Sequence, residues 1–166
     1  MTLFRLEGFA PSVEYRINNL SRLLSGHERQ QRLDSAASRY QWQQIRDCKP
    51  LSTRQDRCLW RISCAPSEGH RVVEAISRAT SIEYFYDWQG GLIWLQVEED
   101  DPRADLIRAA VRSHGGGHAT LIRAEESIKR SVSVFEPQAQ PLAALSKRYR
   151  QNFDPHGILN PGRMGT

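Results

Sequence analysis

A chain of 166 residues, 39% hydrophobic and 25% charged, is long enough for one well-buried domain and leaves little room for a second. It has no apolar run of the ~20 residues needed to cross a bilayer, and its first residues lack the order of a signal peptide. The net charge of +4 comes from basic and acidic residues that alternate along the chain, which argues against a nucleic-acid-binding block. These features predict a cytoplasmic globular protein.

The first fifty residues predict a strand followed by helices. The segment LFRLEG (3–8) alternates apolar and charged side chains, as a half-buried strand does. Pro11 then begins a helix that ends at Gly26, with an apolar face at helical spacing. That face comprises Val13, Ile17, Leu20 and Leu24. A short strand near Arg32 and a helix around Trp42 complete an N-terminal strand–helix unit.

Residues 58–124 carry the clearest pattern. Apolar residues alternate over 58–64, and Pro66 begins a helix. Two aromatic-rich strands, SIEYFYDW and LIWLQVE, flank the turn QGG and form a hairpin. Asp101 is expected to cap a helix that starts at Pro102 and ends at the glycines 115–117, before a last strand, HATLIRA. The buried stripe of that helix is predicted to be Leu106, Ile107, Ala110 and Val111.

This order, β-α-β-β-α-β, predicts an α+β, ferredoxin-like fold with an antiparallel sheet and helices on one face. After Ala124 the segment 125–141 has no clear period and is expected to be a loop. A closing helix, LAALSKRYRQNF, is expected to bury its apolar residues. These are Leu142, Leu145, Tyr149 and Phe153. The three cysteines, Cys48, Cys58 and Cys64, have no CxxC spacing and are expected to be reduced.

The segment HGGGH (114–118) invites two interpretations that its position disfavours. A metal pair of histidines four apart needs a continuous helix, and three glycines separate His114 from His118. A phosphate loop needs a strand before the glycines and a helix after them, whereas here the order is reversed. A helix end followed by a turn is favoured. No nucleophile–base motif is found elsewhere, so no catalytic residue and no metal ligand is assigned.

A cluster of aromatic residues in the hairpin could stack on nucleic-acid bases. It comprises Tyr84, Phe85, Tyr86, Trp88 and Trp94. RNA-binding ferredoxin-like domains place such residues on the open face of the sheet, but their basic–glycine–aromatic signature is missing from both central strands. Core and interface packing is therefore favoured, and no nucleic-acid partner is expected.

The C-terminal stretch FDPHGILNPGRM (153–164) resembles the closing signature of FAD-linked oxidases of the vanillyl-alcohol-oxidase type. Other segments, LFRLEG, CLWRISCAP, YDWQGGLIWLQV and GGHATLIRA, occur in the order found in FAD-binding subunits of glycolate oxidases. The resemblance covers residues 3–164. It implies that residues 1–140 form the cap domain of such a subunit, and that residues 141–166 form a helix and an NPGR tail returning to the flavin domain.

The resemblance also implies the chemistry. The family's glycine-rich flavin-binding domain is expected to precede this sequence, so the chain is expected to be part of a longer flavoprotein, inactive by itself and without tightly bound FAD. Asn160 and Arg163 are implied to contact FAD, and His118, Trp88 and Arg61 to line the cleft. A buried Arg61 would need a carboxylate or carbonyl partner, and Asp87 is the candidate.

The implied activity is oxidation of glycolate or a related small 2-hydroxy acid. The implied partners are a catalytic flavoprotein subunit and an iron–sulfur subunit, which would bring the protein to the inner face of the membrane. An uncovered face of the fragment would allow a homodimer. The alternative is a non-enzymatic ferredoxin-like binding or assembly module.

Overall fold

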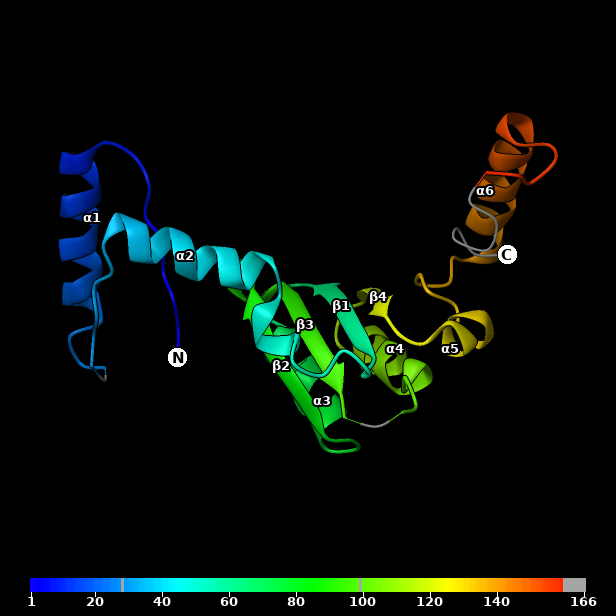
Figure 1. The fold of residues 1–166 in the computed structure, drawn as a ribbon, viewed down its shortest axis with the longest axis horizontal. Coiled ribbons are helices and arrows are strands. Elements are labelled where there is room, and N and C mark those ends of the chain that lie inside the picture. The colour runs from blue at the N-terminus through cyan, green and yellow to red at the C-terminus, as the bar shows by residue number, and fades with distance from the viewer. Residues whose placement is uncertain (28, 99, 160–166) are drawn as a thin grey trace. The chain divides into compact units, whose positions relative to one another are not determined.

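The structure, a computed structural model, describes residues 1–27, 29–98 and 100–159. The chain divides into two units, Met1–Lys49 and Pro50–Thr166. Figure 1 labels the helices and strands of both units. No helix in the described ranges is long and apolar enough to span a membrane.

In the described residues of the N-terminal unit, the α-helices are α1 (Ala10–Leu23) and α2 (Ser35–Arg46). Pro11 lies in the first turn of α1, where its missing N–H is no loss, and the Asp34 carboxylate caps α2 by accepting a hydrogen bond from Ala37 N at 2.8 Å. The strands predicted at 3–8 and near Arg32 do not form. A strand needs a partner for its backbone, and here the Glu7 carbonyl accepts a hydrogen bond from the Arg16 side chain instead.

The sheet of the second unit is four-stranded, and two helices connect its strands in the predicted order. The elements are β1 (Leu59–Cys64), α3 (Gly69–Ser77), β2 (Ile82–Asp87), β3 (Leu92–Val97), α4 (Ala104–Ser113) and β4 (Gly117–Arg123). The strands lie in the order β2-β3-β1-β4, and every neighbouring pair is antiparallel. The ferredoxin-like prediction is confirmed.

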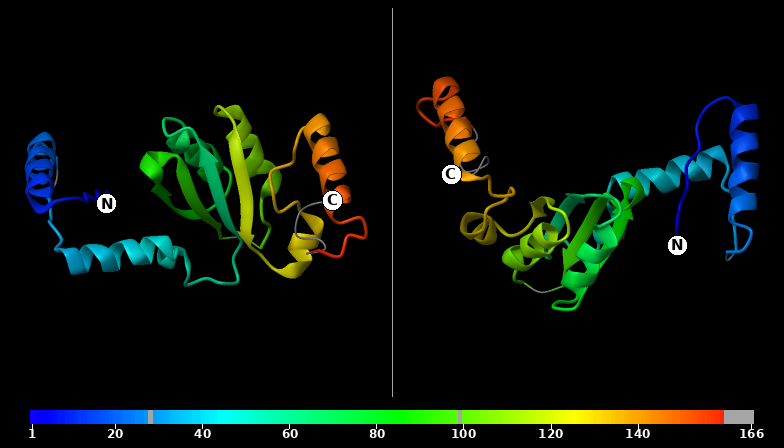
Figure 2. Two further views of the ribbon diagram at one scale, coloured as in Figure 1. Left: turned by 90° about the horizontal axis from the view of Figure 1, so that it is seen from above. Right: turned by 180° about the vertical axis from the view of Figure 1, so that it is seen from behind.

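Both helices cover the same face of the sheet. In Figure 1 the strands lie in front of α3 and α4, and the reverse view in Figure 2 shows the helices in front. The core between these layers contains Trp60, Ile62, Val72, Val73, Ile76, Ile93, Leu95, Val97, Ile107, Ala110, Val111, Ala119 and Leu121. Alternation along β1 and β3 points their members of the core inward, and neither α3 nor α4 covers the opposite face of the sheet (Figure 1, Figure 2).

Helix α4 differs from its prediction in two ways. It begins at Ala104, and Asp101 accepts a hydrogen bond from Arg103 N at 2.8 Å in the preceding turn instead of capping the helix. Its buried face includes Arg108, which is 5% exposed, whereas Leu106 is only half-buried. Arg108 fits there because its guanidinium lies 5.3 Å from the Trp60 ring centroid and donates to the Phe135 carbonyl at 3.0 Å.

The C-terminal part differs more. The predicted loop contains a short helix, α5 (Glu126–Ser131), and the closing helix α6 (Gln140–Phe153) is present as expected. The prediction that α6 buries its apolar stripe is wrong. Its four members, Leu142, Leu145, Tyr149 and Phe153, are between 52% and 70% exposed. Helical spacing identified the stripe correctly, but spacing does not provide a surface for it to pack against.

Candidate functional site

The candidate site is the open face of the sheet, on the side away from α3 and α4. Strand pairing aligns one residue from each strand in a row across this face. In the order of the strands from β4 to β2, the row is Thr120, Arg61, Trp94 and Phe85. Residues directly opposite on paired strands point to the same side, so a single cation lies among two aromatic rings and a hydroxyl.

Arg61 is held in this row by an aromatic contact. Its guanidinium carbon lies 5.4 Å from the centroid of the Trp88 ring, within the range of a cation–π interaction. The expected pairing of Arg61 with Asp87 is not formed. The Asp87 carboxylate instead accepts a hydrogen bond from Trp88 N at 2.7 Å, which fixes the start of the turn after β2.

The turn that carries Trp88 has an unusual backbone. The strand predicted through Trp88 ends at Asp87, and a 3₁₀ turn, η2 (Trp88–Gly90), follows. Trp88 and Gln89 have φ angles of 51° and 57°, in the left-handed region that bulky side chains rarely adopt. Such outliers persist only where the surrounding structure holds them.

Close backbone contacts hold this turn. A Cβ built on Gly69, in the first turn of α3, would lie 2.1 Å from the Gly90 carbonyl oxygen. A Cβ on Gly117 would lie 2.2 Å from the Ser63 carbonyl oxygen. Glycine therefore lets α3 approach η2, and the start of β4 approach β1, at the end of the sheet where Trp88 lies.

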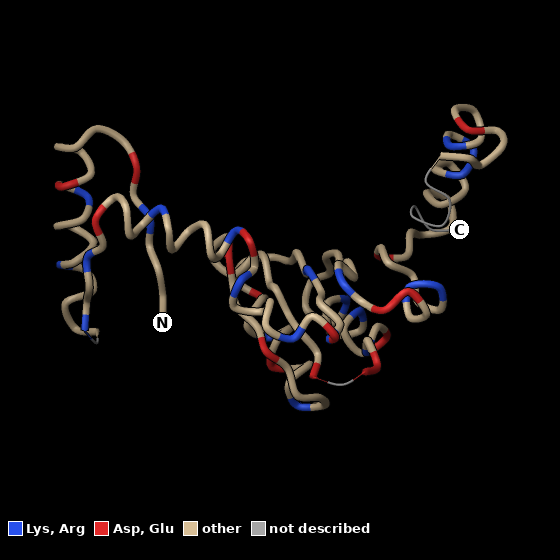
Figure 3. Tube along the Cα trace, viewed as in Figure 1, with Lys and Arg blue, Asp and Glu red and all other residues tan. Residues whose placement is uncertain are grey.

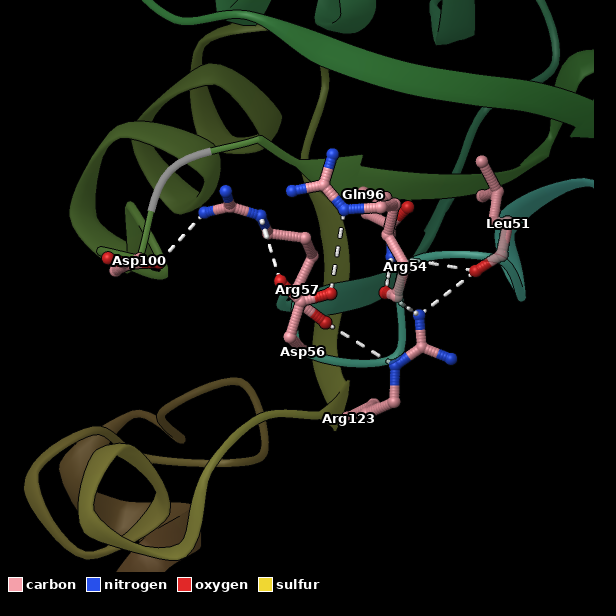
Figure 4. A network of polar contacts seen from close by, with 7 residues as sticks. All are labelled: Leu51, Arg54, Asp56, Arg57, Gln96, Asp100 and Arg123. Carbon is pink, nitrogen blue, oxygen red and sulfur yellow. Dashed lines mark hydrogen bonds and ion pairs between the residues drawn. The ribbon is translucent and has the colours of Figure 1, made fainter.

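The opposite end of the face is covered by the segment Leu51–Arg57 (Figure 4). The buried Gln96 amide donates to the Arg54 carbonyl at 2.7 Å, and Arg123 donates to the Leu51 carbonyl at 2.9 Å. Arg57 pairs with Asp100 at 2.8 Å. These bonds satisfy Gln96 and fix the segment, so the row around Arg61 lies between a covered end and the η2 turn.

The other predicted site residues have different positions. His118 pairs with Ser63, in the row next to Arg61, and is exposed on β4. His114, at the end of α4, has Nδ1 2.9 Å from the Ala110 carbonyl. Asn160 and Arg163 lie outside the described residues. The structure thus brings Arg61 and Trp88 together and places His118 on the same face.

The aromatic cluster of the hairpin is split between the two faces. Phe85 and Trp94 pair on the open face, whereas Tyr84 and Tyr86 alternate to the helix side, where their ring centroids are 5.4 Å apart. Burial, together with the neighbouring Tyr84, raises the pKa of Tyr86 to about 12. The sequence pattern missed Thr120 in the open row, because only strand register reveals it.

Metal and thiol chemistry find little support in this structure. Within the ranges that the structure describes, no three histidine, cysteine or acidic residues gather as a metal site. None of the cysteines, all three of which the structure describes, forms a disulfide, and burial raises the pKa of Cys58 and of Cys64, which disfavours the reactive thiolates. Basic and acidic residues are interspersed along the chain, with no long run of one sign (Figure 3).

Most of this chain is similar to part of a known protein. Glycolate oxidase subunit GlcE from Escherichia coli (strain K12) is 32% identical over 123 residues, which is 74% of this chain. The chain is a distant relative of that subunit. The match covers only 30% of the length of GlcE. No protein-family model matches the chain, and no solved structure matches it.

Proposed function

We propose that the chain is the C-terminal cap domain of the FAD-binding subunit of a glycolate oxidase complex. The single observation that carries this proposal is the similarity to glycolate oxidase subunit GlcE over 123 residues. The observed ferredoxin-like sheet is the fold predicted from the pattern of residues 58–124, and it provides the open face on which the proposed cap would act. The proposed division is a cap over residues 1–140 and a helix and tail over residues 141–166.

The open sheet face is proposed to cover the flavin site in the longer protein. This side presents the aromatic rings of Trp94 and Phe85 beside Arg61, which suits a surface that closes over a planar cofactor. Trp88 and His118 would line the cleft, and Asn160 and Arg163 of the tail would contact FAD. FAD supplies the redox chemistry when bound; the cap residues orient ligands and exclude water.

The whole complex is proposed to oxidise glycolate or a related small 2-hydroxy acid. Its partners would be a catalytic flavoprotein subunit and an iron–sulfur subunit, which would bring this subunit to the inner face of the membrane. The chain alone, without a flavin-binding domain, is proposed to be inactive and to bind FAD weakly.

The test is the visible absorption spectrum of the protein purified from its full natural reading frame. Bound flavin is the expected result, and a colourless, folded protein that ignores added FAD would contradict the proposal. In that protein, Arg163→Ala is expected to lower flavin content, because a rigidly presented guanidinium suits a phosphate partner. Arg148→Ala, on the exposed surface of α6, is the matched control and should leave flavin content unchanged.

A second candidate is a non-enzymatic binding or assembly module. It is favoured by one observation: Phe85 and Trp94 lie side by side on the open face of a ferredoxin-like sheet, as base-stacking residues do. Binding of single-stranded RNA that weakens steeply as salt rises would support this alternative. The interspersed charges speak against it, since a nucleic-acid surface concentrates basic residues.

A further inference from the structure

Arg61 lacks the partners that two other partly or fully buried arginines, Arg108 and Arg123, have. Arg108 donates to two carbonyls and lies beside Glu136, and Arg123 donates to three carbonyls. In the described residues, by contrast, no carboxylate and no carbonyl accepts a hydrogen bond from Arg61, whose one described contact is the Trp88 ring. A guanidinium has five N–H donors, so a half-buried one without acceptors has unused binding capacity.

The fold holds that guanidinium in a defined place. Trp88 stands at a left-handed position that its bulk disfavours, and the Asp87 carboxylate and the glycine contacts at Gly69 and Gly90 maintain the turn. An arginine on the face of an indole keeps its donors, which lie in the guanidinium plane, free at the edge. That edge matches the two oxygens of a carboxylate.

The surroundings favour a small anion over a protein carboxylate or a nucleic acid. Trp94 and Phe85 continue the row beyond Arg61, and apolar neighbours strengthen a charge-assisted hydrogen bond by lowering the local dielectric. Thr120, on the other side, offers a hydroxyl that can bind a second polar group. A basic patch of several residues, as a polyanion would need, is missing from this row.

We propose that Arg61, held by Trp88, binds the carboxylate of a small 2-hydroxy acid on the open face of the sheet. The ligand class rests on the proposed function, whereas the anion site rests on the geometry alone. Thr120 is the candidate to accept or donate a hydrogen bond at the 2-hydroxyl. The sequence analysis placed Arg61 only in the lining of the cleft. The proposal makes it the residue that binds the carboxylate.

The experiment is a titration of the whole chain with glycolate at constant ionic strength, followed by NMR of the arginine Nε–H and tryptophan indole N–H signals. A saturable shift is expected, with a Kd on the order of 1–10 mM, as suits a ligand with few atoms. Glycolamide, which has the same shape without the charge, and inorganic phosphate are the comparison ligands.

Three variants complete the experiment. Arg61→Gln is expected to weaken glycolate binding at least about tenfold, and Trp88→Leu to weaken it less, because the cation remains but is no longer held. Arg78→Gln, at an exposed arginine directly after α3, is the matched control and should bind as the wild type does. Unchanged thermal unfolding of the variants establishes that they are folded.

Several results would overturn the proposal that Arg61 binds a carboxylate. They are the lack of a saturable shift, equal binding by Arg61→Gln, equal binding of glycolamide, and binding of phosphate but not of glycolate. The titration contains no flavin, so its outcome is independent of the flavin test. If this chain binds glycolate but its longer form holds no FAD, the anion site is supported and the oxidase function is refuted.

Discussion

Gly69 is the position where one added methyl group should disturb both the fold and the candidate site. A Cβ at this residue would lie 2.1 Å from the Gly90 carbonyl oxygen and 3.2 Å from its carbon, and real Cβ atoms do not approach backbone so closely. Gly90 cannot retreat easily, because its own Cα faces the Pro66 carbonyl oxygen, which a Cβ there would meet at 3.0 Å. The Gly69→Ala substitution must therefore move α3 away from the η2 turn.

The expected cost follows from this geometry. Overpacking against fixed neighbours costs about 1–3 kcal/mol, and alanine recovers only a few tenths at the first position of a helix. A net loss of about 2 kcal/mol lowers the midpoint of thermal unfolding by roughly 8 °C for a unit of this size. Since η2 carries Trp88, the same change should also weaken glycolate binding at Arg61.

Thermal unfolding followed by circular dichroism measures the loss, and Gly26→Ala is the matched control. A Cβ on Gly26 meets nothing within 4 Å, so this variant should unfold as the wild type does. Gly116→Ala separates backbone strain from collision, because Gly116 has φ +81° and open space around it. If Gly69→Ala unfolds at the same temperature as Gly26→Ala, the close approach of α3 and η2 is refuted.

Two further predictions concern groups away from the site. Glu136→Ala should lower the free energy of unfolding of the second unit, measured in urea, by about 2–3 kcal/mol. The substitution removes the acceptor for Ala119 N at 3.1 Å and the counter-charge of the buried Arg108. If Glu136→Ala costs as much in an Arg108→Met background, the two side chains do not interact. Tyr86, whose pKa is raised to about 12 mainly by burial, should contribute stability that is complete below its unfolded pKa of about 10 and is lost as the pH rises to about 12. Tyr86→Phe should flatten that pH dependence, and phenolate absorption that titrates fully by about pH 10 would contradict the shift.

Sequence alone was sufficient for the sheet because each strand carries its own signal. Alternation over 58–64 and the aromatic runs around QGG reflect burial of one face, which is a local property of a strand. The same signal misled at 3–8, where alternation is present but no strand partner is. The apolar stripe of α6 shows the same limit, since amphipathicity predicts a helix but not the surface that covers it.

The candidate site was only partly accessible from sequence. Arg61, Trp88 and His118 were identified through the family resemblance, and the fold places them on one face. Arg61 contacts Trp88 instead of Asp87 because of the left-handed turn at residues 88 and 89. Sequence could not predict this turn, because neither Trp88 nor Gln89 is of the residue types, such as glycine or asparagine, that favour positive φ. The burial of Arg108 likewise depends on acceptors 25 and 27 residues away.

The two outer strands of the sheet have unequal capacities for lateral growth. Along β4, the Leu121 N–H donates to the Val134 carbonyl at 2.9 Å and the Ala119 N–H donates to the Glu136 carboxylate. These outward donors are thus already engaged by the segment after α5, and that border is closed to strand addition. The far border is β2, whose one neighbour among the described strands is β3. Another polypeptide that extends the sheet would therefore add its strand next to β2. If the added strand continues the antiparallel pairing, it runs in the same direction as β3.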